Sequence, residues 1–274
     1  MTQRFDQTTV IITGASLGVG AATARLFAEH SANLVLIARG QENLDQLAAE
    51  LAIPDRCLTV AMDVTDTGRF AELLEQVQTR FGSVDILVNN AGFHQRGLAE
   101  SVDAEDLGKM VDVNLKAPIM LSRMMLPYLR KSKTPAIINV ASLAGRTPVP
   151  GSAAYSATKF GLRAFGLALA EELRGSGIKI ASVSPGPIDT GFIMDDIDSV
   201  TDLTFSQPIS TGKQVAEVIA NLVHNKKLDQ PMPSVSGLLT TVSYLFPGIG
   251  RALRPMLEKK GRKTKQRLKR ERQE

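Results

Sequence analysis

The stretch Thr9-Val10-Ile11-Ile12-Thr13-Gly14-Ala15-Ser16-Leu17-Gly18-Val19-Gly20 decides the fold of this chain. Its first five residues form a short apolar run rich in β-branched side chains, which predicts a buried strand. Three glycines follow, and a helical pattern then runs from Ala21 to His30. Glycines between a strand and a helix let the backbone turn tightly and aim N–H groups at a pyrophosphate. The stretch therefore predicts a dinucleotide-binding turn, although its spacing is Gly-x-x-x-Gly-x-Gly rather than the commoner Gly-x-Gly-x-x-Gly.

Further apolar runs alternate with amphipathic patterns along the chain. Strands are expected over Asn33–Ala38, Leu58–Met62, Val84–Val88, Ile137–Val140 and Lys179–Val183. Helices are expected over Glu42–Leu51, Gly68–Arg80, Ala104–Arg130, Val215–Val223 and from Ser152 to Gly175 or Gly177. This alternation predicts an α/β fold with a doubly wound parallel sheet. Such sheets bind ligands beyond the carboxyl ends of their strands.

Composition limits the class of protein. The 274 residues are 43% hydrophobic and 22% charged, which suits one soluble α/β domain. A single cysteine, Cys57, excludes an internal disulfide framework and favours a reducing, cytoplasmic location. We expect no secretory signal and no spanning helix, because the apolar runs are too short. The three histidines are scattered, so we expect no metal site.

Ser142, Tyr155 and Lys159 form the candidate catalytic group. Tyr155 and Lys159 are four residues apart, so they lie on one face of the predicted helix. A tyrosine hydroxyl titrates near pH ~10, and an ammonium beside it would lower that pKa. Ser142, at the end of the preceding strand, is placed to hydrogen-bond a carbonyl oxygen beside the tyrosine. A lone Tyr-x-x-x-Lys match is usually only helix surface, so this interpretation depends on the glycine turn that accompanies it.

Two further positions have a chemical interpretation. Pro118 cannot donate to the main-chain carbonyl of Asn114, so we expect a local kink at which this carbonyl is free to bind a water. Two interpretations follow, a role in a proton relay or a helix that simply bends, and the proton relay is favoured. Arg39 follows the second strand, where an NAD-specific fold places an acid. A guanidinium can bind a 2′-phosphate through two hydrogen bonds, so we predict NADP(H); the alternative is a solvated arginine.

In combination these residues resemble the short-chain dehydrogenase/reductase family, in its common soluble-core form, over roughly residues 8–225. The matching motifs are Thr13-Gly14-x-x-x-Gly18-x-Gly20, Asn89-Asn90-Ala91-Gly92, Asn114, Ser142, Tyr155-x-x-x-Lys159 and Pro185-Gly186. The resemblance implies a Rossmann-type sheet of six to seven strands, in the order 3-2-1-4-5-6-7, with helices on both faces. It also implies hydride transfer between a nicotinamide and a carbonyl or alcohol carbon.

The same resemblance implies a role for each site residue. Tyr155 would be the acid/base, Lys159 would lower its pKa and bind the nicotinamide ribose, and Ser142 would orient the substrate. Asn114 would anchor a water relay. The cofactor-binding positions expected are Gly14, Ser16, Leu17, Gly18, Val19, Arg39, Asp63, Val64, Asn90, Ala91, Gly92, Tyr155, Lys159, Pro185, Gly186, Ile188 and Thr190. A homodimer or homotetramer is expected, through residues 104–130 and 152–174.

The last third of the chain is less regular. Residues 190–210 are expected to be a mobile lid, with an apolar wall formed by Phe192, Ile193, Met194, Leu203 and Phe205. Leu228–Pro233 is a poor strand because its two prolines cannot donate to a ladder. The sequence therefore does not decide whether a seventh strand forms. We therefore divide the chain into a catalytic domain, residues 1–228, and a C-terminal segment, residues 229–274.

That C-terminal segment combines an apolar helix with a basic run. Residues 251–274 contain 11 Lys and Arg and 3 Asp and Glu, a net charge of +8, whereas the whole chain carries +4. Three interpretations compete: a helix packed on the core or a neighbouring subunit and followed by a disordered tail, a peripheral membrane anchor, or nucleic-acid binding. The packed helix is favoured. Nucleic acid is disfavoured because the segment has no aromatic residue beyond Phe246 for stacking.

The leading hypothesis is therefore NADPH-dependent reduction of a ketone to a secondary alcohol. A hydrophobic or lipid-like substrate is expected, such as a 3-oxoacyl thioester, a sphingoid-type ketone or a steroid. The alternative is a non-catalytic NADP(H)-sensing protein, which is disfavoured because Tyr155 and Lys159 are both present.

Overall fold

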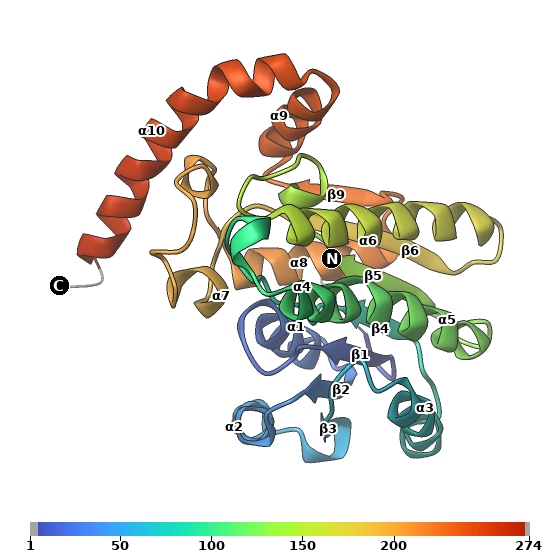
Figure 1. Ribbon diagram of the computed structural model, residues 1–274. Helices are drawn as coiled ribbons and strands as arrows, with labels where there is room; N and C mark the ends of the chain where they lie inside the picture. The colour runs from blue at the N-terminus through green and yellow to red at the C-terminus, as the bar shows by residue number, and fades with distance from the viewer. Residues whose placement is uncertain (1–4, 272–274) are drawn as a thin grey trace.

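The computed structural model describes residues 5–271, and its centre is a seven-stranded parallel sheet (Figure 1). Across the sheet the strands are β3 (Cys57–Ala61), β2 (Asn33–Ala38), β1 (Thr9–Thr13), β4 (Ile86–Asn89), β5 (Ala136–Val140), β6 (Lys179–Pro185) and β9 (Asp229–Met232). Every pair of neighbours is parallel. The doubly wound sheet and its order 3-2-1-4-5-6-7 are confirmed, with β9 in the seventh place.

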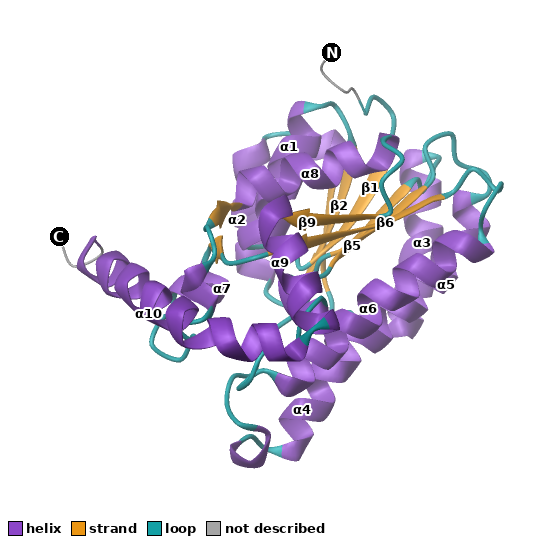
Figure 2. Cartoon of the chain, turned by 90° about the horizontal axis from the view of Figure 1, so that it is seen from above, coloured by secondary structure: helices purple, strands orange, loops and turns teal. Residues whose placement is uncertain are grey.

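Helices cover both faces of this sheet (Figure 2). They are α1 (Gly18–Glu29), α2 (Gln41–Leu51), α3 (Thr67–Phe81), α4 (Ala104–Val111), α5 (Ala117–Leu129), α6 (Ala153–Glu172) and α8 (Gly212–His224), with short 3₁₀ turns at Pro54–Arg56, Ala99–Ser101 and Leu143–Gly145. Successive strand residues face opposite sides. In β1, Val10 and Ile12 therefore join one core with α1, α2 and α8, whereas Ile11 joins the other with α3, α5 and α6.

The seventh strand forms even though it contains a proline. β9 lies at the edge of the sheet and pairs only with β6, from Ser182 opposite Asp229 to Pro185 opposite Met232. An edge strand tolerates proline because one side of its backbone has no strand to bond. The sheet therefore extends past residue 228, where we expected the catalytic domain to end, to Met232.

The helix expected over Ala104–Arg130 is interrupted by a π-helical segment, Asp112–Lys116, between α4 and α5. The N–H of Ala117 donates to the carbonyl of Asp112, five residues back. The predicted kink at Pro118 is therefore corrected: the irregularity lies in the preceding turn. Pro118 itself sits in the first turn of α5, where a missing N–H costs little.

The segment expected to be an irregular lid has local structure. It contains α7 (Gly191–Met194), a 3₁₀ turn (Thr204–Ser206) and a ribbon of β7 (Ile188–Asp189) with β8 (Ser210–Thr211). We call residues 188–211 the lid. Met194 and Phe205 were expected in the wall of the pocket, but they are buried in a small core of the lid with Val200. The mobility of the lid stays a prediction.

Two C-terminal helices, α9 (Ser234–Leu245) and α10 (Pro247–Glu271), follow the sheet and arch over the lid (Figure 1). The basic segment, expected to end as a disordered tail, is helical to Glu271. It is held by contacts that its sequence does not reveal: Lys265 donates to the carbonyls of Asp198 and Val200, and Arg262 pairs with Asp202. Among the helices of residues 5–271, none combines the length and apolarity needed to cross a bilayer.

Candidate active site

A cavity of about 1290 Å³ lies at the carboxyl ends of the strands, between α6, the lid and the C-terminal helices. All the predicted cofactor-binding positions line it: Gly14, Ser16, Leu17, Gly18, Val19, Arg39, Asp63, Val64, Asn90, Ala91, Gly92, Tyr155, Lys159, Pro185, Gly186, Ile188 and Thr190. Ser142 also lines it, whereas Asn114 does not. The fold thus brings residues from seven segments of the sequence to one cavity, as a doubly wound sheet does.

The glycine turn between β1 and α1 has no side chains at its glycines that would block the approach of a phosphate group. Gly14 and Gly18 have φ angles of +63° and +56°, which favour glycine. A Cβ at Gly20 would lie 2.0 Å from the carbonyl oxygen of Gly14, so this position also requires glycine. No side chain caps the first N–H groups of α1. These donors and the positive end of the helix are therefore available to a phosphate, and the turn fits a dinucleotide.

Asn90 holds the glycine turn in place from the neighbouring strand. Its amide Nδ2 donates to the carbonyls of Thr13 (2.9 Å) and Gly14 (3.0 Å). The hydroxyl of Thr13 in turn accepts from the backbone N–H groups of Asn90 and Ala91, both at 3.0 Å. The ends of β1 and β4 are thereby tied together, and the wall of the cavity between them is fixed.

Arg39 and Asp63 line the cavity just after β2 and β3. Arg39 is exposed at the end of β2, with its side chain beside the pocket. Asp63 accepts from the backbone N–H of Thr65 at 2.9 Å and from its hydroxyl at 2.7 Å. These hydrogen bonds, and to a smaller degree the charge of Arg39, lower the pKa of the Asp63 carboxyl. Asp63 is thus an ionised acceptor at neutral pH.

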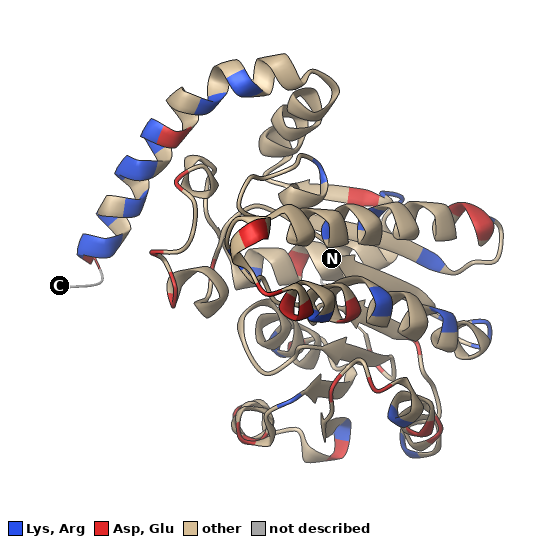
Figure 3. Cartoon of the chain, in the orientation of Figure 1, with Lys and Arg blue, Asp and Glu red and all other residues tan. Residues whose placement is uncertain are grey.

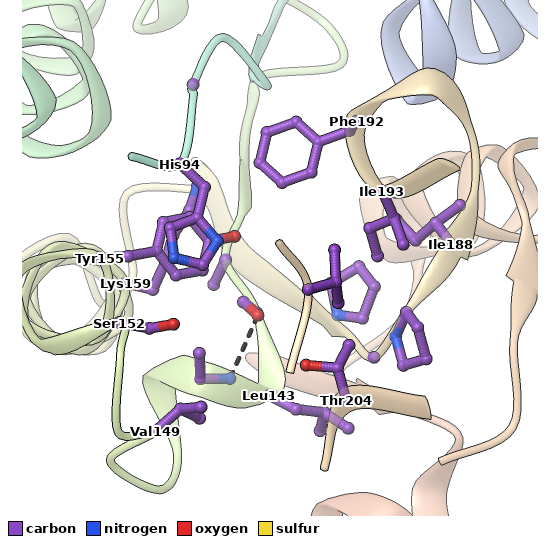
Figure 4. Close-up of a pocket in the computed structure, with 18 of the residues that line it drawn as sticks. His94, Leu143, Val149, Ser152, Tyr155, Lys159, Ile188, Phe192, Ile193 and Thr204 are labelled. Atoms are coloured by element: carbon purple, nitrogen blue, oxygen red, sulfur yellow. Dashed lines mark hydrogen bonds between the residues drawn. The ribbon is translucent and has the colours of Figure 1, made fainter. Parts of the chain in front are cut away.

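Tyr155 and Lys159 lie side by side in the cavity (Figure 4), and Ser142 lines the same cavity. Burial raises the pKa of Tyr155, opposed first by a hydrogen bond with Ser142 and then by the charge of Arg96. Lys159 lies with Nζ 5.7 Å from the centre of the Tyr155 ring and donates to the carbonyl of Val140 at 3.0 Å. Burial lowers the pKa of Lys159 to about 8. The pKa of Tyr155 is therefore raised rather than lowered, and the groups that oppose burial are Ser142 and Arg96 rather than Lys159.

Asn114 is buried behind the cavity wall. Its side-chain oxygen accepts from the N–H of Phe93 at 3.0 Å, and its Nδ2 donates to the carbonyl of Phe93 at 2.8 Å. A Cβ on Gly92 would lie 3.0 Å from the Asn114 oxygen and 3.5 Å from Lys159 Nζ. The glycine therefore lets Asn114 and Lys159 approach the same point of the backbone, and the side chain of Asn114 positions the loop after β4.

His94 was missed by the sequence analysis, which considered it only as a possible metal ligand. Its ring stacks on Tyr155, with centroids 4.1 Å apart and planes inclined by 16° (Figure 4). Burial, followed by the charges of Arg96 and Lys159, lowers the pKa of His94 to about 4, so the ring is neutral at pH 7. Within the described chain its Nε2 is buried without a hydrogen-bond partner. The position of His94 just after the Asn89–Gly92 motif is the one sequence signal that places it near the site.

Arg96 is the second missed residue. It donates through Nη2 to the carbonyl of Phe192 at 2.8 Å, and its guanidinium lies 5.7 Å from the centre of the Phe192 ring. These contacts join the loop after β4 to the lid beside Tyr155.

Within residues 5–271 no cluster of three or more His, Cys, Asp or Glu side chains could hold a metal ion.

Comparison with known proteins identifies the family. The sequence profile described as short chain dehydrogenase matches residues 8–199. The chain belongs to the short-chain dehydrogenase/reductase family. It is therefore an oxidoreductase that acts on CH–OH and C=O groups, in a family that uses NAD(P)(H).

The similarity to relatives in this family extends over most of the chain. A ketoacyl reductase, HetN, from Nostoc sp. (strain PCC 7120) is 34% identical over 220 residues, which cover 80% of this chain and 76% of HetN. Dehydrogenase/reductase SDR family member 7B from Bos taurus is 31% identical over 272 residues, covering 93% of this chain and 83% of the bovine protein. A crystal structure of a short-chain dehydrogenase/reductase from Brucella melitensis superposes with a TM-score of 0.78 at 29% identity, over 84% of this chain and 96% of that one.

Proposed function

We propose that this protein is an NADPH-dependent reductase that converts a ketone on a hydrophobic, lipid-like molecule to a secondary alcohol. The observation that carries this proposal is the apolar extension of the cavity beyond Tyr155. Phe192, Ile193 and Leu203 of the lid line it together with Leu239 and Val242 of α9. A site lined in this way excludes water and favours a long apolar chain. A 3-oxoacyl or sphingoid-type ketone meets this description, and the name of HetN, a ketoacyl reductase, supports the first.

Each polar residue then has a task. The glycine turn and Asn90–Gly92 would hold the dinucleotide, and Arg39 would bind its 2′-phosphate. When bound, NADPH supplies the hydride. Tyr155 donates its phenolic proton to the carbonyl oxygen, which Ser142 also hydrogen-bonds. The raised pKa of Tyr155 keeps that proton in place at neutral pH, as reduction requires. Lys159 and the main-chain carbonyl of Asn114 would return a proton to Tyr155 through water.

Oxidation of NADPH by a series of ketones of increasing chain length tests the substrate. We expect the specificity constant kcat/KM to rise with chain length, because each added methylene buried in the apolar wall contributes about 0.8 kcal/mol. A preference for short ketones would contradict the lipid-like assignment. Absence of turnover with tight NADPH binding would instead favour the sensing protein.

Arg39→Asp tests the cofactor. A charge-assisted hydrogen bond contributes about 1.5–3 kcal/mol, so the ratio of kcat/KM for NADPH to that for NADH should fall about 10- to 100-fold. Lys226→Asp, which makes the same change of charge on an exposed residue outside the cavity, is the control. An unchanged ratio in Arg39→Asp would remove the assignment of NADP(H).

We also propose a cytoplasmic homodimer or homotetramer that assembles through α4, α5 and α6. The partly exposed Val111 (41%) and Met120 (38%) on these helices support such an interface. Light scattering on the eluted protein measures the mass, and a monomer at micromolar concentration would contradict this proposal.

A further inference from the structure

The C-terminal helices expose an unusual amount of apolar surface. Of the fifteen large apolar side chains that are exposed in the described chain, nine lie within residues 235–256. The largest exposed fractions are those of Val235 (70%), Leu238 (67%), Leu245 (63%), Phe246 (59%) and Met256 (61%). Single exposed apolar residues are normal, but a contiguous group marks an interaction site. We call residues 235–256 the apolar ridge.

The apolar ridge also borders the entrance of the cavity. Leu239, Tyr244, Ile249, Leu253 and Met256 are exposed, yet each of them lines the cavity of the candidate active site. The cavity therefore opens onto the ridge. A molecule that touches the ridge lies directly beside the path to Tyr155.

Beyond the ridge, α10 carries a row of lysines and an arginine. Its inner face packs on the lid through Gly261, Lys265 and Leu268. Since residues of a helix are 100° apart, Lys259, Lys263 and Arg270 project from the opposite face. All three are exposed, and none pairs with an acidic residue within the described part of the chain. We call them the cationic row; Figure 3 shows basic residues along the length of α10.

Apolar side chains next to unpaired cations match one kind of surface. An anionic bilayer takes up the apolar groups at its interface and attracts the cations to its headgroups. A second copy of this chain is a poorer partner, because an isologous contact would bring two α10 helices, each with a net charge of +8, close together. Nucleic acid would satisfy the cationic row but offers nothing to the leucines of the ridge.

We propose that the apolar ridge and the cationic row dock this protein on the surface of an anionic bilayer, with the entrance of the cavity toward the lipid. The docking is inferred only from the exposed residues of the apolar ridge and the cationic row. Delivery of a substrate from the bilayer rests, in addition, on the proposed reduction of a lipid-like ketone. Substrate would then reach Tyr155 from the membrane without crossing water.

Vesicle flotation of the full-length protein tests the docking. We expect it to bind vesicles of phosphatidylcholine with phosphatidylglycerol much more strongly than vesicles of phosphatidylcholine alone. The variant K259Q/K263Q/R270Q should bind the anionic vesicles roughly 100-fold more weakly at low salt, since it loses three cations near the surface. The matched control K131Q/K133Q/K226Q removes three exposed lysines elsewhere and should bind like the wild type.

A second variant, Leu238→Gln with Phe246→Gln, tests the ridge and should also lose flotation. Equal binding to both kinds of vesicle, or equal binding by the cationic-row variant and its control, would overturn the docking. The ridge would instead be an interface between copies under two conditions: the wild type does not float, and Leu238→Gln with Phe246→Gln turns an oligomer into a smaller species in sedimentation velocity. Binding of the wild type to duplex DNA but not to vesicles would assign the cationic row to nucleic acid.

The docking and the proposed function fail in different ways. All these variants lie outside the catalytic group, so they should keep wild-type NADPH oxidation with a short, water-soluble ketone. A loss of flotation alone leaves the reductase intact. A protein that floats but reduces no ketone would refute the proposed reaction and leave the docking in place.

Discussion

At the scale of single residues, the stacking of His94 on Tyr155 is the feature that sequence could not supply. Tyr155, Lys159 and Ser142 were predictable because helical spacing and a strand end place them together. His94 lies 61 residues before Tyr155 in a loop without periodicity, and its contact depends on how Asn114 binds the backbone of Phe93. The same is true of Arg96, whose partner Phe192 belongs to the lid.

The burial of His94, with the nearby charges of Arg96 and Lys159, makes stability depend on pH. His94 has a pKa of about 4 in the folded protein, against ~6.5 in an unfolded chain. The contribution of neutral His94 to the free energy of unfolding is therefore fully present above pH ~6.5. It is lost as the pH falls toward 4, by an amount on the order of 2 kcal/mol. His94→Phe keeps an aromatic ring on Tyr155 and should flatten the decline in the free energy of unfolding over this range.

Urea denaturation at a series of pH values measures this effect. His30→Phe changes a histidine outside the cavity and is the control, which should keep the steeper decline of the wild type. A decline that is as steep in His94→Phe as in the wild type would show that other groups cause the acid sensitivity.

At the scale of elements, tertiary contacts decided what the pattern left open. The first six strands of the sheet along the chain were predictable because each has an apolar run long enough to indicate a strand without tertiary information. The seventh could not be decided, since its stabilisation comes from a charge cluster: Asp229 pairs with Arg146 and Arg163 and accepts from the hydroxyl of Ser184 at 3.2 Å. These contacts tie β9 to β6, α6 and the loop after β5, and they offset the weak ladder of a proline-containing strand.

Asp229→Asn tests this cluster. The side chains of Asp229 and Arg146 are each only 10% exposed, so removing the carboxylate leaves two arginines without their acidic partner. Breaking a buried ion pair costs about 3–5 kcal/mol, and we expect the free energy of unfolding to fall by about 3 kcal/mol. Asp55→Asn, on an exposed turn, should change it by less than about 0.5 kcal/mol. Similar losses in both variants would contradict the role of the cluster.

The contact between α10 and the lid depends on Gly261. A Cβ at this position would lie 1.7 Å from the carbonyl oxygen of Asp202, so Gly261→Val must push the helix away from the lid. We expect trypsin to cleave α10 about tenfold faster and the KM for long-chain ketones to rise, because the apolar wall opens. Gly248→Val is the control, since nothing lies within 4 Å of its Cβ. Equal cleavage rates in the two variants would show that the contact does not hold α10.

At the scale of the whole molecule, the chain combines an acidic catalytic part with a basic C-terminal helix. Residues 251–274 carry a net charge of +8 while the whole chain carries +4, so residues 1–250 carry −4. Part of the basic charge binds the lid, through Arg262 with Asp202 and Lys269 with Asp198. The cationic row of Lys259, Lys263 and Arg270 faces outward on the opposite side of α10. The sequence predicted the charge asymmetry but not this division, because it depends on which face of α10 meets the lid.

The central claim is that Tyr155 supplies the proton to a ketone reduced by NADPH, and the kinetics of Tyr155→Phe test it most directly. Phenylalanine keeps the ring that stacks on His94 and removes only the hydroxyl. Loss of a general acid should lower kcat for NADPH oxidation by about 10³-fold, while the affinity for NADPH, measured by calorimetry, stays within about twofold. Turnover within about twofold of the wild type would contradict the claim.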